Sequence, residues 1–241
     1  MPATSPRKSG PSPRPVRAPS NSLDLSHPRR WRVKPSSQEN APPPVVPDPC
    51  PLPRDDDMYG MVNKAMHKMV VDFHGEETWL RIRERAGCEI EDFVRMDAYP
   101  DAVTYGLVGA AVEELNADPA ALLRAFGVYW ISYAQESGYR DFFQACDSYI
   151  SFVQQLDAMH ARLQLAFREL RAPQFACTVL SPTSVRVVYR SQRHGLAPFV
   201  IGLFEGLGPV FSVKVAVEKT EEHISEETGV EIHYLVQLEP A

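Results

Sequence analysis

Two groups of residues in this 241-residue chain have types and spacing that could bind a metal or a charged ligand. The first is His160, in the stretch LDAMHARL, where apolar residues recur at steps of three and four, as on one face of an α-helix. Burying an imidazole nitrogen without a partner costs about 1–3 kcal/mol. Two interpretations are therefore open: a core histidine bonded to a backbone carbonyl, or a metal ligand.

The second group lies in the stretch VYRSQRHGL. Strand alternation would place Tyr189, Ser191 and Arg193 on one face, after two apolar residues. A guanidinium flanked by two hydroxyls suits a carboxylate, because arginine donates two parallel charge-assisted hydrogen bonds. Taken alone, the pattern is weak and is more typical of an ordinary exposed strand end.

The elements that must position these groups change character along the chain. Residues before about 173 show helical periodicity, and Asp118-Pro119 is typical of a helix start. Later residues alternate with period two, apart from one further helical stretch. Helices first and an antiparallel sheet second indicate an α+β fold. We predict helices over 62–73, 76–87, 104–116, 120–135, around His160 and over 197–208, and strands over 175–180, 185–191, 212–219 and 230–238.

Residues 1–57 have a different composition from the rest. They hold 15 of the 22 prolines and a net charge of +3, whereas residues 58–241 carry −9. Such a segment buries too little apolar surface to fold, so we predict a disordered Pro/Ser/Arg-rich tail followed by one domain over 58–241. Met58 is an alternative start, in which case the tail is not translated.

Composition also excludes some classes of protein. No apolar run is long enough to span a bilayer, and an acidic domain argues against nucleic acid as a partner. The four cysteines form no C-x-x-C motif and no close pair. We therefore expect a reduced, cytoplasmic protein without a membrane partner.

Five segments appear in one order: MYGMVNKA, LDAMHARL, LRAPQF, YRSQR and GLAPFVIGLFEGLG. Together they resemble the haem nitric oxide/oxygen binding (H-NOX) family, the haem domain also found in soluble guanylate cyclases, over residues 58 to about 238. The resemblance implies haem b (iron protoporphyrin IX) between a helical subdomain and the sheet. It implies His160 as the proximal iron ligand and Pro173 as a proline that presses on the macrocycle. It implies that Tyr189, Ser191 and Arg193 bind the haem propionates.

The resemblance also places a set of residues on the distal side of the haem, where a gas would bind: Val62, Met66, Trp130, Phe199 and Leu203. Oxygen-binding members carry a tyrosine at the position of Phe199, and a hydrogen bond to a charged group is worth about 1.5–3 kcal/mol. Phe199 and Met66 cannot donate one, whereas Trp130 can, through its indole N–H. We therefore expect the pocket to favour NO and CO over O₂.

The function implied by this resemblance is that of a nitric oxide sensor without enzymatic activity of its own. NO binding would release His160, the N-terminal helices would shift against the sheet, and the signal would pass to a separate protein such as a histidine kinase or a cyclic-nucleotide enzyme. The alternatives are an oxygen or redox sensor on the same scaffold, a haem enzyme, or an interaction module that has lost its haem. The haem enzyme has the least support, because no distal residue of this sequence resembles the His/Arg pair that acid–base chemistry on a peroxide would need.

Overall fold

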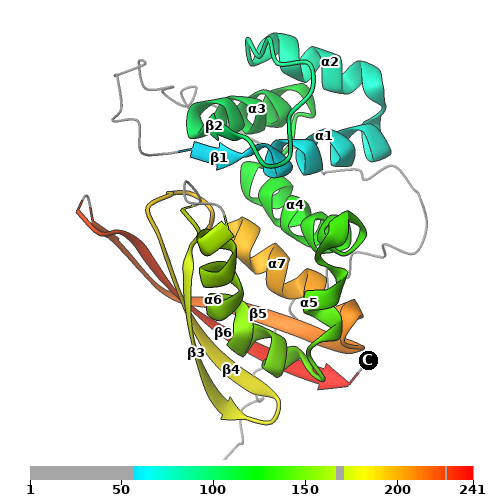
Figure 1. Cartoon of the computed structure of the whole chain (residues 1–241). Coiled ribbons are helices and arrows are strands. Elements are labelled where there is room, and N and C mark those ends of the chain that lie inside the picture. Colours follow the sequence, from blue (N-terminus) through cyan, green and yellow to red (C-terminus); the bar gives the residue numbers. More distant parts are fainter. Residues whose placement is uncertain (1–56, 167–170, 226, 241) are drawn as a thin grey trace, which may run out of the picture.

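The computed structural model describes residues 57–166, 171–225 and 227–240. The tail predicted over 1–57 lies outside the described residues, apart from Asp57, which begins the first strand. Figure 1 shows a helical part above and a sheet part below, with helix α4 running between them. This is the α+β arrangement predicted from the order of the sequence patterns.

The helical part contains four main helices whose apolar faces form one core cluster. Gly75 separates the first two, at a φ of 86°, a backbone conformation that favours glycine. The fourth begins as predicted, with the Asp118 side chain accepting a hydrogen bond from the Ala121 N–H at 2.8 Å and Pro119 in the first turn. These helices are α1 (Gly60–His74), α2 (Glu76–Arg85), α3 (Asp101–Glu114) and α4 (Pro119–Ala134).

Several short elements were missed by the sequence analysis. A two-stranded ladder joins β1 (Asp57–Tyr59) to β2 (Ala98–Pro100), and strands of three residues are too short to show an alternation. After α4 the chain continues through a π-helical turn, η1 (Gln135–Tyr139), into α5 (Arg140–Gln144). Gly138 marks the kink, with a φ of 94°.

The sheet part is one antiparallel sheet of four strands in the order β3-β4-β6-β5. Helices α6 and α7 cover one face of it (Figure 1) and share a second core cluster with its inward side chains. Val185, Val187 and Tyr189 are all buried, so the alternation predicted along β4 is confirmed. The elements are α6 (Tyr149–Ala166), β3 (Gln174–Ser181), β4 (Ser184–Ser191), α7 (Ala197–Val210), β5 (Val213–Ser225) and β6 (Gly229–Pro240).

Strand β5 lies at one edge of the sheet and is longer than the predicted 212–219. Residues Glu218 to Ile224 are exposed and mostly polar or charged, so their side chains carry no apolar alternation. The pairing with β6 shifts register between Lys219 and Glu221. This edge strand thus carries many charged side chains, and its pairing with β6 is irregular.

The two parts meet closely where α4 crosses α7. A Cβ added to Gly127 would lie 2.1 Å from the Phe199 carbonyl oxygen, and one added to Gly202 would lie 2.0 Å from that of Arg124. The Arg124 guanidinium, which lies alongside, donates to the Glu205 carboxylate, with Nε at 2.6 Å. Only glycine allows the two backbones to approach this closely.

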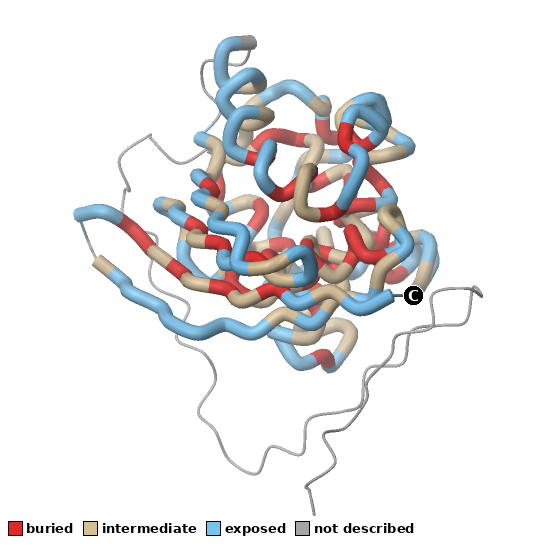
Figure 2. The backbone as a smooth tube through the Cα atoms, turned by 90° about the horizontal axis from the view of Figure 1, so that it is seen from below, coloured by how far each residue is buried: buried red, intermediate tan, exposed pale blue. Residues whose placement is uncertain are grey.

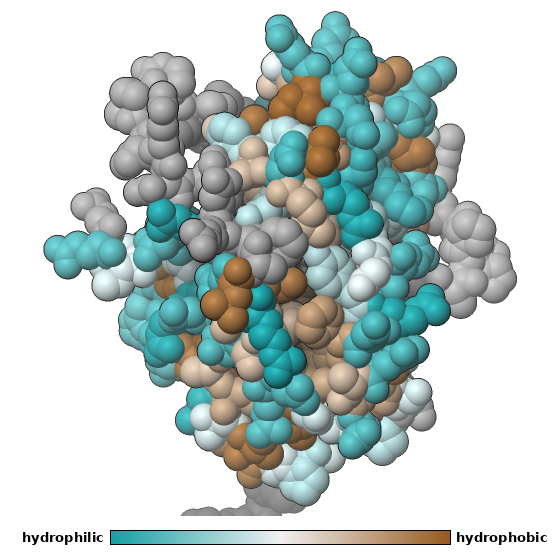
Figure 3. All heavy atoms as spheres, in the orientation of Figure 1, coloured by the Kyte–Doolittle hydropathy of each residue, from teal (hydrophilic) through white to brown (hydrophobic). Residues whose placement is uncertain are grey.

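Burial is concentrated where the helices face the sheet, as Figure 2 shows, while the outer strand is exposed along most of its length. The face in Figure 3 is mainly hydrophilic, with apolar residues scattered between the polar ones. Trp130 packs against both core clusters. The boundary between the two parts is therefore the apolar interior of the molecule, and the candidate site lies there.

Candidate functional site

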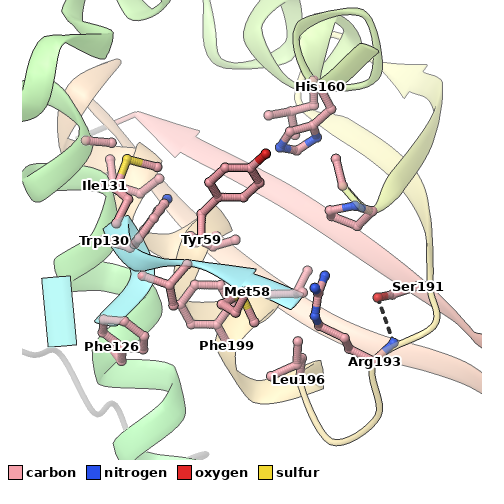
Figure 4. A pocket seen from close by; sticks show the side chains of 18 of the residues that line it. Met58, Tyr59, Phe126, Trp130, Ile131, His160, Ser191, Arg193, Leu196 and Phe199 are labelled. Atoms are coloured by element: carbon pink, nitrogen blue, oxygen red, sulfur yellow. Dashed lines mark hydrogen bonds between the residues drawn. The ribbon is translucent and has the colours of Figure 1, made fainter. Parts of the chain in front are cut away.

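A cavity of about 310 Å³ lies between the helical part and the sheet part. Its walls come from both parts: β1, the first turn of α1, α3 and α4 on one side, and α5, α6, β3, β4 and α7 on the other. Most of the side chains that line it are apolar or aromatic. Segments far apart in the sequence thus converge on one space, into which several side chains point in Figure 4. A large apolar cavity with a few polar groups is the usual form of a cofactor site.

Nine of the ten site residues expected from the sequence line this cavity: Val62, Trp130, His160, Pro173, Tyr189, Ser191, Arg193, Phe199 and Leu203. Met66 does not. It is buried in the core of the helical part, because the cavity reaches only the first turn of α1 and Met66 lies one turn further on. Its placement on the distal side of the haem stays a prediction.

His160 extends from α6 into the cavity (Figure 4). Its Nδ1 is buried without a hydrogen-bond partner among the described residues. Nε2 is therefore the nitrogen that could bind a ligand in the cavity. Burial lowers the pKa of His160 to about 4, with the charge of Asp157 acting in the opposite direction. The imidazole is therefore neutral at pH 7, which is the form that binds a metal.

The orphaned Nδ1 bears on the two interpretations of this histidine. A core histidine would have a hydrogen-bond partner, and none is present within the described part of the chain. Nor does any group of three His, Cys, Asp or Glu side chains that could hold a metal ion exist there. A lone imidazole facing an apolar cavity fits the axial ligand of a metal that arrives within an apolar cofactor, such as haem.

The polar end of the cavity is built at the end of β4. Tyr189 is 3% exposed, and burial raises the pKa of its phenol, while a hydrogen bond with Ser191 and the charge of Arg193 act to lower it. Arg193 does not lie on the strand, as alternation predicted, because β4 ends at Ser191. Arg193 lies in the turn after the strand and still lines the cavity. Its backbone N–H donates to Ser191 Oγ at 3.0 Å (Figure 4).

Asp101, at the start of α3, holds Arg193 from the helical part. The Arg193 Nε donates to Asp101 Oδ2 at 2.7 Å, and the two side chains are 11% and 9% exposed. A second guanidinium nitrogen donates to the Arg171 carbonyl at 2.8 Å. Sequence reasoning missed Asp101, because an acidic residue in the first turn of a helix is ordinary and its partner lies 92 residues away.

The opposite wall is aromatic. Phe199 packs on Phe126 with ring centroids 5.2 Å apart and on Trp130 at 6.4 Å. Trp130 carries a donor on this wall, its indole N–H, and the Tyr59 hydroxyl points across the cavity toward His160 (Figure 4). Tyr59 and Phe126 were missed by the sequence analysis, Tyr59 because it precedes the first helix and Phe126 because it fits any apolar helix face.

The haem-NO-binding family model matches residues 59–219, which include every residue that lines the cavity except Met58. The chain belongs to the haem-NO-binding family. His160 and the Tyr189–Arg193 segment lie inside the matched range, so the histidine that faces the cavity belongs to a domain of a haem-binding family.

Curated relatives of this haem-NO-binding domain include soluble guanylate cyclase 89Db of Drosophila melanogaster, 22% identical over 60% of this chain and 22% of that protein. The guanylate cyclase soluble subunit beta-2 of Rattus norvegicus is 30% identical over 47% of this chain and 17% of that protein. The chain spans less than a quarter of either relative.

Solved structures with the same fold cover the domain almost completely. An H-NOX protein from S. oneidensis in the Fe(II)NO ligation state matches with a TM-score of 0.66 at 21% identity, over 76% of this chain and 99% of that one. The oxygen complex of an oxygen-binding H-NOX domain related to soluble guanylate cyclases matches with a TM-score of 0.67 at 16% identity, over 76% and 95%. The fold is therefore that of H-NOX domains.

Among the helices of the described residues, none combines the length and the apolar character needed to cross a bilayer.

Proposed function

We propose that this haem-NO-binding domain carries haem b and senses nitric oxide. The observation that carries the proposal is the neutral, buried His160, whose Nδ1 has no partner in the described part of the chain and whose ring faces an apolar cavity. When bound, haem supplies a ferrous iron at which a gas can bind. His160 would be its protein ligand.

The polar end of the cavity would receive the propionates. Tyr189, Ser191 and Arg193 offer two hydroxyls and a guanidinium, a set of donors that matches carboxylates. Pro173 lies on the cavity wall, and its rigid ring is suited to press on the macrocycle. This assignment puts the charged groups of the cofactor beside Arg193 and the two hydroxyls at the end of β4.

The choice of gas rests on Phe199. Bound O₂ carries partial negative charge and gains about 1.5–3 kcal/mol from a hydrogen bond, whereas NO and CO need little such help. Phe199 has no donor and packs among Phe126 and Trp130. We therefore propose NO as the physiological ligand, with CO as a second one.

An oxygen sensor is the second candidate, and one observation favours it. Trp130 lines the cavity and carries an indole N–H, and the Tyr59 hydroxyl also extends into the cavity (Figure 4). Either donor, if aimed at bound O₂, would supply the stabilisation that Phe199 lacks.

The signal would leave through a change in packing. If NO binding releases His160, the helical part would shift against the sheet part across their shared apolar boundary. A ligand that favours one of two packings acts as a switch. The receiver we propose is a separate cytoplasmic protein, such as a histidine kinase or a cyclic-nucleotide enzyme, with no catalytic step in this domain itself.

Absorption spectra of the purified ferrous protein test this function. We expect a Soret band, five-coordinate ferrous haem that is unchanged in air, and a five-coordinate nitrosyl spectrum after NO is added. A stable oxygen complex formed in air would favour the oxygen sensor instead. Absence of haem after expression with excess haem precursor would contradict both.

A further inference from the structure

The imidazole of His160 lies against an aromatic ring that sequence analysis did not single out. Phe175, the second residue of β3, stacks on it with ring centroids 5.6 Å apart and an angle of 24° between the planes. Phe175 is 7% exposed and lines the same cavity. The two rings therefore cover each other at the wall of the proposed haem site.

This stack takes the place of an interaction that iron-binding histidines usually have. The second nitrogen of such a histidine ordinarily donates to a carbonyl or carboxylate, which fixes the tautomer and the plane of the ring. No acceptor for His160 Nδ1 exists among the described residues. Rotation of the imidazole about its Cβ–Cγ bond is therefore limited by the packing of neighbouring side chains. Phe175 is the ring that stacks on it.

Phe175 is itself held on several sides. Its backbone N–H donates to the Asp157 carboxylate at 3.1 Å, and Asp157 lies three residues before His160 on α6. Its ring packs at 57° on Tyr189, with centroids 5.4 Å apart, and edge-on against Phe204 of α7 at 6.4 Å. The ring is therefore fixed relative to the helix that carries His160 and to the strand that carries the carboxylate-binding group.

We propose that Phe175 is the positioning residue of His160: its ring sets the plane of the imidazole in place of a hydrogen bond and slows its release from the iron. The inference rests on the proposed role of His160 as the haem ligand. On release the bonding electron pair returns to Nε2 and no proton moves. Because Phe175 also touches Tyr189 and Phe204, it is placed to pass the displacement of His160 to β4 and α7.

Phe175→Leu tests the proposal in the haem-loaded full chain. The two readouts are the iron–histidine stretching band in the resonance Raman spectrum of the ferrous protein and the rate at which the six-coordinate nitrosyl becomes five-coordinate in stopped flow. An aromatic pair contributes about 0.5–1.5 kcal/mol, so losing it should speed the release of His160 about two- to tenfold. The iron–histidine band should shift or broaden as the imidazole plane becomes less defined.

Two further variants separate positioning from general loss of stability. Phe175→Tyr keeps the ring and should restore the parent band and rate. Phe93→Leu removes an equally large buried ring that lies in the helical core and does not line the cavity. It should lower the melting temperature as Phe175→Leu does, while leaving the band and the rate unchanged.

The possible outcomes distinguish this inference from the proposed function. A parent protein without any iron–histidine band would overturn the haem-ligand role of His160 and the inference with it. If the parent shows the band and Phe175→Leu matches Phe93→Leu in both readouts, the positioning role of Phe175 alone is wrong.

Discussion

At the scale of single residues, the site depends on which atoms have partners. His160 has one nitrogen sealed in the protein without an acceptor in the described part of the chain and another left for the cavity. Arg193, in contrast, is held by Asp101 and by the Arg171 carbonyl before any ligand arrives. The first group is therefore free to bind and release, while the second is a fixed anchor.

Replacing His160 by glycine should empty the axial position and leave space for a free imidazole. We expect His160→Gly to retain haem only when imidazole is supplied during expression, because no other described His, Cys, Asp or Glu lines the cavity. Haem content by absorbance checks this, with His223→Gly on the exposed end of β5 as the control. Full haem content without imidazole would exclude His160 as the ligand.

Replacing Phe199 by tyrosine should add one donor to the aromatic wall. We expect Phe199→Tyr to gain O₂ affinity, up to about ten- to a hundredfold if the new hydroxyl reaches the bound gas. NO binding should change little. Equilibrium spectra under graded O₂ measure the gain, and Phe73→Tyr, which adds a hydroxyl outside the cavity, should show none. A parent that already binds O₂ tightly would contradict the choice of NO and direct attention to Trp130.

At the scale of elements, the crossing of α4 and α7 sets how the two parts touch. Gly127 and Gly202 bring the backbones together, and each helix carries part of the aromatic wall, Trp130 on α4 and Phe199 on α7. Any side chain placed at the crossing would have to move backbone atoms. The position of the aromatic wall thus depends on the absence of a Cβ at both glycines of the crossing.

Gly127→Ala should therefore destabilise the protein although alanine favours helices. Its Cβ would lie 2.1 Å from the Phe199 carbonyl oxygen, and overpacking of this kind costs about 1–3 kcal/mol. Gly106→Ala on α3 is the matched control, because its Cβ would have nothing within 4 Å, and it should stabilise by about 0.5–1 kcal/mol. Urea unfolding measures both, and equal effects of the two substitutions would contradict the tight crossing.

Most of these elements could be predicted, because their signals are local. A few neighbouring residues are enough to recognise the apolar stripe of α6, the alternation of β4 and the helix start at Asp118-Pro119. Nine of the ten expected site residues line the cavity. Met66 does not line the cavity, because periodicity gives the face of a helix and not how far a cavity extends along it. Asp101 and Phe175 were missed because their importance comes from contacts with Arg193 and His160, which form only in the folded chain.

At the scale of the whole molecule, the Asp101–Arg193 pair ties the helical part to the sheet part. Both side chains are nearly buried, and Asp101 Oδ1 has no partner among the described residues. The pair joins the start of α3 to the turn that follows β4. The part of the molecule that would bind propionates is thus linked directly to the part that would move.

Asp101→Asn should loosen this link. The asparagine side chain has no negative charge to offer the Arg193 guanidinium. Losing that charge from a buried pair costs about 1–3 kcal/mol of the free energy of unfolding. Asp92→Asn removes the charge from an exposed pair with Lys64, whose nitrogen lies 2.6 Å away, and should cost less than about 1 kcal/mol. Urea unfolding of both variants gives the comparison, and equal losses would show that the buried pair contributes nothing special.

Deleting residues 1–56 should leave the domain intact, because β1 begins at Asp57 and the removed segment has no apolar periodicity. We expect an unchanged melting temperature and unchanged NO binding. A melting temperature lowered by about 2–4 °C, which corresponds to about 1 kcal/mol for a protein of this size, would mean that the tail packs on the domain.

The outer strand β5 has a consequence for how this molecule can meet other proteins. A free strand edge is a template on which a second chain can add its own strand and extend the ladder. Charged side chains and a break in register over Lys219 to Glu221 make the β5 edge a poor template. Continuation of the sheet from one molecule into the next is disfavoured along this side, so a receiver that docks on β5 would have to recognise its side chains rather than its backbone.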